Sequence, residues 1–535
     1  MNLLKTVATV SGLTLISRIT GLARETLTAS LFGAGAQTDA FFVAFRLPNL
    51  LRRLFAEGAF SQAFVPVLGQ VKAQEGEHPA RRLASQVALL LLVVLTLITA
   101  LAILAAPLLV WLMTGGFSGD TARFELATAM TRWMFPYIVL ISMVALAAGV
   151  LNTWSSFKLP AFTPVLLNLA FIAAALFLAP RLETPIWALV VAVLVGGVAQ
   201  VGLQLWGLHR LGLLADIPGL FLKPFRSLAE AWRNPAVRRM LQLMLPASLA
   251  VSVAQISLVI NTHIASRLET GSVSWLTYAD RLMEFPTALL GVALATVLLP
   301  SLTKAHGEND PARVSALIDW GLRLVLLLAV PASIGLALLA EPLAASLFHY
   351  GAFQANDLMM TAQAMMAYAV GLLGLIGVKV LAPGFYAQQN VRTPVKIAIF
   401  TLVLTQLLNL VFVPVLDHAG LALATSVAAL CNAGLLLIRL RQKGSYTPEA
   451  GWGWLWLKVI VSGLAMAAVC WSAASHFNWV ALQAEPFTRL GALFGIVLVS
   501  ALCYLLMLTV LRVRWQDFLR RVPSTPTSAS TPPSP

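Results

Sequence analysis

Charged residues are scarce in this sequence of 535 amino acids. Asp, Glu, Lys and Arg together make up 11% of the chain, while hydrophobic residues make up 59%. Soluble domains carry about 25% charged residues, so the composition argues against an ordinary soluble protein of several domains. The mean hydropathy of +0.84 instead indicates an all-α polytopic membrane protein, because helices satisfy their backbone hydrogen bonds internally within a lipid bilayer.

Residues that build metal and catalytic sites are also few. The three cysteines lie in apolar runs without a CxxC pair, which argues against a disulfide framework or a zinc site. The seven histidines are scattered, and no P-loop, GxSxG or HExxH motif stands where one would be needed. The sequence therefore favours a transporter over an enzyme and predicts no cofactor and no metal site.

The net charge of +14 does not indicate nucleic-acid binding in so apolar a chain. Lys and Arg concentrate in cytoplasmic loops of membrane proteins and set their orientation. With a cytoplasmic N-terminus, the loops on the other side hold only four arginines, at Arg123, Arg181, Arg267 and Arg489. The pattern predicts a multi-pass membrane protein with both termini in the cytoplasm and no cleavable signal peptide.

Fourteen segments are apolar and long enough to span a bilayer, which requires ~20 residues. The longest predicted cytoplasmic connection, at about residues 209–239, divides them into six and eight. In chain order the segments are Val7–Phe32, Thr38–Leu68, Val87–Met113, Leu126–Leu151, Ala161–Pro180, Pro185–Leu208, Met240–Ser266, Ser272–Thr303, Ala316–Ser346, Leu358–Val378, Ile397–Leu416, Ala419–Ile438, Trp454–Ser475 and Gly491–Leu511.

Three of these predicted helices carry charges where lipid would be expected. An ionisable residue at the centre of a membrane helix costs about 2.5–3.5 kcal/mol on insertion scales, so these side chains must face water or one another. Arginines outnumber acids on the first two helices, and a surplus of cations in a hydrated cavity suggests an anionic ligand. The charged residues are Arg18, Arg24 and Glu25, then Asp39, Arg46, Arg52, Arg53 and Glu57, and on the eighth helix Asp280, Arg281 and Glu284.

Two structural interpretations of the same charges remain open. Ion pairs could fasten helices together, with Asp39 beside an arginine of the first helix and Arg281 beside Asp280 or Glu284. Side chains near helix ends, such as Arg53 and Glu57, could instead extend to the lipid headgroups.

Three stretches of the sequence resemble the MurJ (MviN) lipid II flippases, a family of the MOP exporter superfamily. They are "SRITGLARE", "GAGAQTDAFFVAFRLPNLLRRLFAEGAFSQAFVPVL" and "YADRLMEFPTALLGVALATVLLPSL". The resemblance extends to about Arg514. It implies an N-terminal lobe of six helices (1–210), a cytoplasmic connection (211–236), a second six-helix lobe (237–445) and two further helices (446–515), before a disordered tail (516–535).

The resemblance also implies a function. Lipid II, the undecaprenyl-diphosphate-linked precursor of peptidoglycan, would cross from the cytoplasmic to the periplasmic leaflet by alternating access in a cationic central cavity. The partners would be lipid II and the phospholipid bilayer. The positions that match the essential cavity residues of the family are Arg18, Arg24, Asp39, Arg52 and Arg281, and Arg53 and Glu57 lie in the same motif.

Some details stay open at this point. Certain relatives bind sodium through an acidic residue on the seventh helix, but Met240–Ser266 contains neither Asp nor Glu, so the coupling ion or membrane potential is not predicted. The oligomeric state is not predicted either. The alternatives are a flippase of another lipid-linked oligosaccharide and a MATE-like drug antiporter, although the arginine surplus argues against the export of cations.

Overall fold

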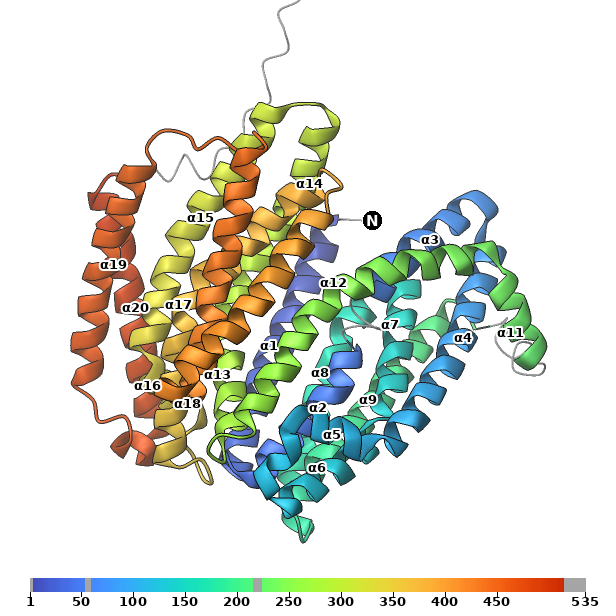
Figure 1. The fold of residues 1–535 in the computed structure, drawn as a ribbon, viewed down its shortest axis with the longest axis horizontal. Helices are drawn as coiled ribbons and strands as arrows, with labels where there is room; N and C mark the ends of the chain where they lie inside the picture. The colour runs from blue at the N-terminus through green and yellow to red at the C-terminus, as the bar shows by residue number, and fades with distance from the viewer. Residues whose placement is uncertain (1–2, 53–58, 215–223, 514–535) are drawn as a thin grey trace, which may run out of the picture. The chain divides into compact units, whose positions relative to one another are not determined.

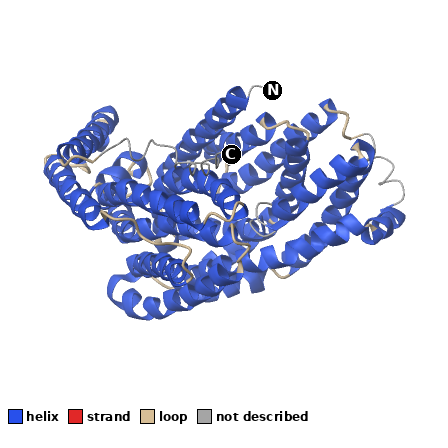
Figure 2. Cartoon of the chain, turned by 90° about the horizontal axis from the view of Figure 1, so that it is seen from above, coloured by secondary structure: helices blue, strands red, loops and turns tan. Residues whose placement is uncertain are grey.

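The computed structural model describes residues 3–52, 59–214 and 224–513, and every regular element in these ranges is a helix (Figures 1 and 2). Nine helices in these ranges are long and apolar enough to cross a membrane. All fourteen predicted segments fall on helices, apart from residues 53–58, which lie outside the described part. The predicted class, an all-α polytopic membrane protein, is confirmed.

The chain forms two compact units, and the first comprises Met1–Tyr278 and Leu347–Met360. Its long apolar helices pack around buried Phe, Leu, Val and Ala side chains. Its helices are α1 (Leu3–Phe32), α2 (Ala36–Arg52), α3 (Ala59–Glu75), α4 (Glu77–Leu104), α5 (Ala106–Thr114), η2 (Gly115–Gly119), α6 (Thr121–Met134), α7 (Tyr137–Thr153), α8 (Lys158–Ala173), η3 (Ala174–Leu178), η4 (Ala179–Arg181), α9 (Trp187–Arg210), α11 (Pro224–Arg233), α12 (Pro235–Ala265) and the first half of α13 (Ser272–Pro286).

The second unit comprises Ala279–Ser346 and Thr361–Pro535. Within it, α19 and α20 form an antiparallel hairpin, seen in orange and red in Figure 1. Its helices are the rest of α13, the π-helix η5 (Thr287–Val292), α14 (Ala293–Gly307), α15 (Pro311–Leu338), most of α16 (Ala340–Phe348) and of α17 (Ala355–Tyr386), α18 (Arg392–Gln442), α19 (Trp452–Ser475), η6 (Ala481–Ala484) and α20 (Pro486–Val510).

Two of the predicted spans share the long element α18. Its backbone leaves the helical region at Asp417, where φ is 48° and ψ is −129°. Asp is one of the few residue types enriched at positive φ, and the break at this residue lies between the two predicted segments, Ile397–Leu416 and Ala419–Ile438. The break lies where the apolar pattern is interrupted by Asp417 and His418.

Close helix packing in the second unit depends on glycine. A Cβ atom at Gly371 of α17 would lie 2.5 Å from the Ser426 Cα of α18, and one at Gly374 would lie 2.6 Å from the Ala429 carbonyl carbon. The Ser426 hydroxyl donates to the Ala367 carbonyl at 2.8 Å. Small residues permit such backbone contact between membrane helices, where van der Waals packing replaces the hydrophobic effect as the driving force.

We expect Gly371→Ala to lower the stability of the protein by about 1–3 kcal/mol, because the added methyl group forces two backbones apart. The matched control is Gly434→Ala on α18, where a Cβ would meet nothing within 4 Å. Thermal unfolding in detergent measures the difference. Equal unfolding midpoints for the two variants would show that α17 and α18 adjust without cost.

Candidate functional site

Arg24 lies between α1 and α8 inside the first unit. Its Nη1 donates to Asn168 Oδ1 at 3.1 Å, and its Nη2 pairs with the Glu25 carboxylate. The guanidinium carbon lies 5.2 Å from the centre of the Phe171 ring. Only 17% of the Arg24 side chain is exposed, so the structure keeps a cation among helices by giving it polar partners.

Asn168 fixes the register of α8 against α1 and had no signal in the sequence analysis. Its Nδ2 donates to the Ser17 carbonyl at 3.0 Å and to Thr20 Oγ1 at 3.1 Å, while its oxygen accepts from Arg24. All hydrogen-bonding atoms of the amide are therefore used to hold α1 and orient Arg24. Arg18, nearly two turns before Arg24 on α1, is exposed.

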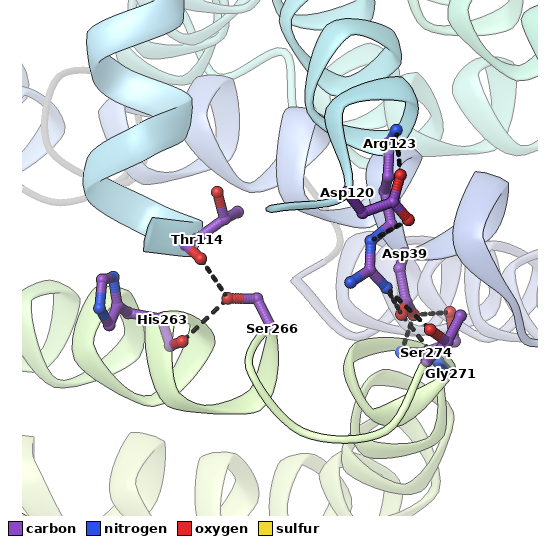
Figure 3. A network of polar contacts seen from close by, with 9 residues as sticks. Asp39, Thr114, Asp120, Arg123, His263, Ser266, Gly271 and Ser274 are labelled. Carbon is purple, nitrogen blue, oxygen red and sulfur yellow. Dashed lines mark hydrogen bonds and ion pairs between the residues drawn. The ribbon is translucent and has the colours of Figure 1, made fainter. Parts of the chain in front are cut away.

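Asp39, in the first turn of α2, is 1% exposed and accepts hydrogen bonds from another part of the chain (Figure 3). Its Oδ1 accepts from the Ser274 backbone N at 2.9 Å and from Ser274 Oγ at 2.6 Å. Its Oδ2 accepts from the Gly271 N at 2.8 Å and lies 3.5 Å from Arg123 Nη1. Asp39 thus caps the N-terminus of α13, where backbone N–H groups lack partners and the helix dipole favours an anion.

The turn between α12 and α13 is held by further contacts within the same unit. Ser266 Oγ donates to the Thr114 carbonyl at 3.0 Å and to the His263 carbonyl at 2.8 Å (Figure 3). The His263 ring hydrogen-bonds the Leu112 carbonyl at 3.0 Å. Together with Asp39, these contacts attach the turn to α2, α5 and α6.

Arg123, which lies beside Asp39, was not singled out as functional by the sequence analysis, as was the case for Asn168. It is 6% exposed, its guanidinium carbon lies 4.2 Å from the centre of the Phe117 ring, and its Nε lies 3.6 Å from Asp120 Oδ2. Its position in a predicted extracytoplasmic loop gave no hint of burial, and no spacing in the sequence connects it to Asp39.

The remaining charges of α2 also contact polar groups. Arg46 donates to Thr262 Oγ1 at 2.5 Å and to Thr277 Oγ1 at 2.9 Å, which joins α2 to α12 and α13. Arg52 Nε donates to Asn49 Oδ1 at 3.0 Å and is half-buried. The predicted site residues Arg53 and Glu57 lie outside the described residues.

Arg281 belongs to the second unit, three residues after the division within α13. Its Nη1 lies 3.1 Å from Glu284 Oε2, and about a third of each side chain is exposed, 36% and 39%. The π-helix η5 follows at Thr287, and π-helical turns are frequent near functional sites. The structure therefore brings Arg18, Arg24, Asp39 and Arg52 into one unit and places Arg281 in the other.

The arginines of this arrangement present donors that suit an anion. Arginine presents a planar set of donors that matches phosphate oxygens, and Glu25 and Glu284 each already occupy part of such a set. Among the described residues, no three His, Cys, Asp or Glu side chains come together as a metal site would require.

Comparison with known proteins gives strong matches. The family model described as "Lipid II flippase MurJ" matches residues 28–486. A Burkholderia cenocepacia protein named "Lipid II flippase MurJ" is 51% identical over 521 residues, which cover 97% of this chain and 100% of that protein. A Vibrio cholerae protein named "Probable lipid II flippase MurJ" is 38% identical and covers 96% of this chain and 97% of its own.

Solved structures resemble the fold. One described as "Lipid II flippase MurJ, inward closed conformation" has a TM-score of 0.75 at 24% identity and covers 96% of this chain and 99% of its own. A multidrug resistance MATE family transporter of the MOP superfamily, in an inward-facing conformation, has a TM-score of 0.68 at 15% identity and covers 82% and 98%. At these identities the structures establish a common fold.

Proposed function

This chain belongs to the MurJ family of lipid II flippases, and we propose that it carries lipid II from the cytoplasmic to the periplasmic leaflet by alternating access. Lipid II is a peptidoglycan precursor linked to an undecaprenyl diphosphate, so the transported headgroup includes two phosphates. The protein is a transporter, not an enzyme, and a multi-pass membrane protein. The bacterial inner membrane is its proposed location.

The observation that supports an anionic headgroup is the setting of Arg24. The guanidinium is held within the first unit by a neutral oxygen on Asn168 and by Glu25. A phosphate that approaches can take over donors from Glu25, and Glu25 can reclaim them on release. Transport requires such exchange, because a cation without a competing acid would hold a diphosphate too tightly to let it leave.

The other predicted site residues take roles that follow from their settings. Arg18, which is exposed, and Arg52 and Arg281, which are partly exposed, would add contacts to phosphate or carboxylate groups of the substrate. Asp39 is fully engaged with the N-terminus of α13, so it would position helices. Arg53 and Glu57 remain predicted contributors from the sequence alone.

The proposed orientation places both termini in the cytoplasm. Among the described residues of the first unit, basic side chains gather near one set of helix ends and on the short helix α11, and lysines and arginines favour the cytoplasmic side. They include Lys72, Arg81, Arg82, Lys158, Arg210, Arg226, Arg233, Arg238 and Arg239.

The test uses cells depleted of their own lipid II flippase and supplied with this protein. We expect wild type to restore lipid II in the outer leaflet and Arg281→Ala to fail at equal membrane levels, because Arg281 would bind the headgroup. Arg313→Ala is the matched control, since this arginine of the same unit lies in the first turn of α15 and pairs with Glu308, just before that helix. Absence of export by well-inserted wild type would favour another lipid-linked oligosaccharide or a drug as the substrate.

A further inference from the structure

Asp319, on α15 of the second unit, is the centre of a polar network that neither the sequence motifs nor the proposed site includes. It is 1% exposed. Its Oδ1 accepts from the Tyr446 hydroxyl at 2.8 Å, from Trp452 Nε1 at 2.7 Å and from the Glu449 backbone N at 3.3 Å. Tyr446 and Glu449 belong to residues 443–451, the segment that joins α18 to α19, and Trp452 is the first residue of α19.

Arg323, one turn later on α15, completes the network. Its Nε donates to Asp319 Oδ2 at 2.5 Å, and its Nη2 donates to the Ala450 carbonyl at 2.9 Å. Its guanidinium carbon lies 5.3 Å from the centre of the Trp452 ring. Both oxygens of the Asp319 carboxylate therefore have donors, which is the condition under which a buried polar network makes a structure rigid.

Ser315 extends the same face of α15 by one turn in the other direction. The Thr447 backbone N donates to Ser315 Oγ at 2.9 Å. Residues spaced by four lie on one side of a helix, so Ser315, Asp319 and Arg323 form a continuous polar face. Burial, followed by the hydrogen bond to Asp319, raises the pKa of Tyr446, so its hydroxyl remains a donor at neutral pH.

The hairpin that follows this segment packs on the same helix. Tyr504 of α20 donates its hydroxyl to the Leu327 carbonyl of α15 at 2.9 Å. A Cβ at Gly463 of α19 would lie 2.8 Å from Ile334 Cδ1. Helix α15 thus supports the connecting segment at its N-terminal half and the hairpin farther along.

We propose that Asp319 is a positioning residue that fixes the α19–α20 hairpin to α15 during transport. The carboxylate holds the entry to α19 at Trp452, so the hairpin moves with α15. Large apolar side chains of the hairpin, such as Trp454, Leu464 and Phe494, are 64–70% exposed and would keep a fixed orientation towards the lipid. The consequence for export rests on the proposed function, whereas the attachment itself does not.

The attachment is tested by electron paramagnetic resonance distances in lipid nanodiscs. Spin labels replace Leu328 on α15 and Leu464 on α19, both exposed, after the three native cysteines are changed to serine. Wild type is expected to give one narrow distance distribution. Asp319→Ala is expected to broaden this distribution. Tyr446→Phe is expected to broaden it less, because this change leaves the Asp319–Arg323 pair intact. Asp310→Asn is the control, since Asp310 caps α15 by accepting from the Arg313 N and asparagine can keep this cap.

Export of lipid II by the same variants completes the test. A broadened distribution together with reduced export supports the proposal. An unchanged distribution in both variants overturns the positioning role. A broadened distribution with normal export overturns its importance for transport. If wild type exports no lipid II but the distribution still broadens in Asp319→Ala, the proposed function fails while the attachment stands.

Discussion

Replacing Arg24 with alanine is expected to abolish lipid II export while leaving the protein inserted in the membrane. The change removes the guanidinium that contacts Asn168 and Glu25 and that we propose for phosphate binding. For the pair between Arg24 and a phosphate, we expect a loss of about 2–5 kcal/mol of binding free energy, the cost of truncating one partner of a buried, hydrogen-bonded charge pair. Each 1.4 kcal/mol corresponds to about a tenfold loss of affinity. Outer-leaflet lipid II in flippase-depleted cells, compared at matched protein levels, measures the loss.

One further variant separates the charge of Arg24 from the shape of its side chain, and a second variant is a control at another arginine. Arg24→Lys keeps the positive charge but loses the planar arrangement of donors, and we expect it to retain little export. Arg181→Ala serves as the control, because Arg181 is an exposed arginine of the same unit that donates to the Phe177 carbonyl at 2.9 Å. Normal export by Arg24→Ala would contradict a role for this cation in binding.

The helices could be predicted because lipid leaves few alternatives for a long apolar run. Within the described residues, the fourteen segments lie on helices, and the division at Asp417 falls where polar residues interrupt the apolar pattern. The breaks within spans were less visible. Thr38–Leu68 is covered by α2 and α3, and Ser272–Thr303 by α13, η5 and α14, because the apolar pattern alone does not reveal where a helix changes its hydrogen bonding.

The site was predicted at the level of residue types, and its contacts were not. Asp39 was placed beside an arginine of the first helix in the ion-pair interpretation, and that placement was wrong. Its arginine is Arg123 of α6, 84 positions away, and its strongest contacts are with Gly271 and Ser274, more than 230 positions away. Helical periodicity relates residues within one helix, whereas these partners meet only through tertiary packing. The same interpretation named Asp280 or Glu284 as the partner of Arg281, and the structure pairs Arg281 with Glu284, three residues later on the same helix.

Asp39→Asn is expected to loosen the turn between α12 and α13 and to lower the stability of the first unit. Asparagine has nearly the same shape, but its amide group presents donors where the carboxylate Oδ2 now accepts from the Gly271 N and faces Arg123. A buried charge that loses its partner costs about 3–5 kcal/mol. Hydrogen exchange of residues 266–278 and the unfolding midpoint in detergent are the measurements.

Asp120→Asn is the matched control, because both substitutions remove one negative partner of Arg123. The Asp120 side chain is 42% exposed, and an exposed ion pair contributes about 0–1 kcal/mol. Asparagine at this position also preserves the cap of α6, in which Asp120 Oδ1 accepts from the Arg123 N at 3.0 Å. If the two variants lose equal stability, neutralising Arg123 is the whole role of Asp39. A much larger loss for Asp39→Asn, with faster exchange confined to the turn, assigns the effect to the cap of α13. That result would make Asp39 essential through the helices it joins, without any contact to the substrate.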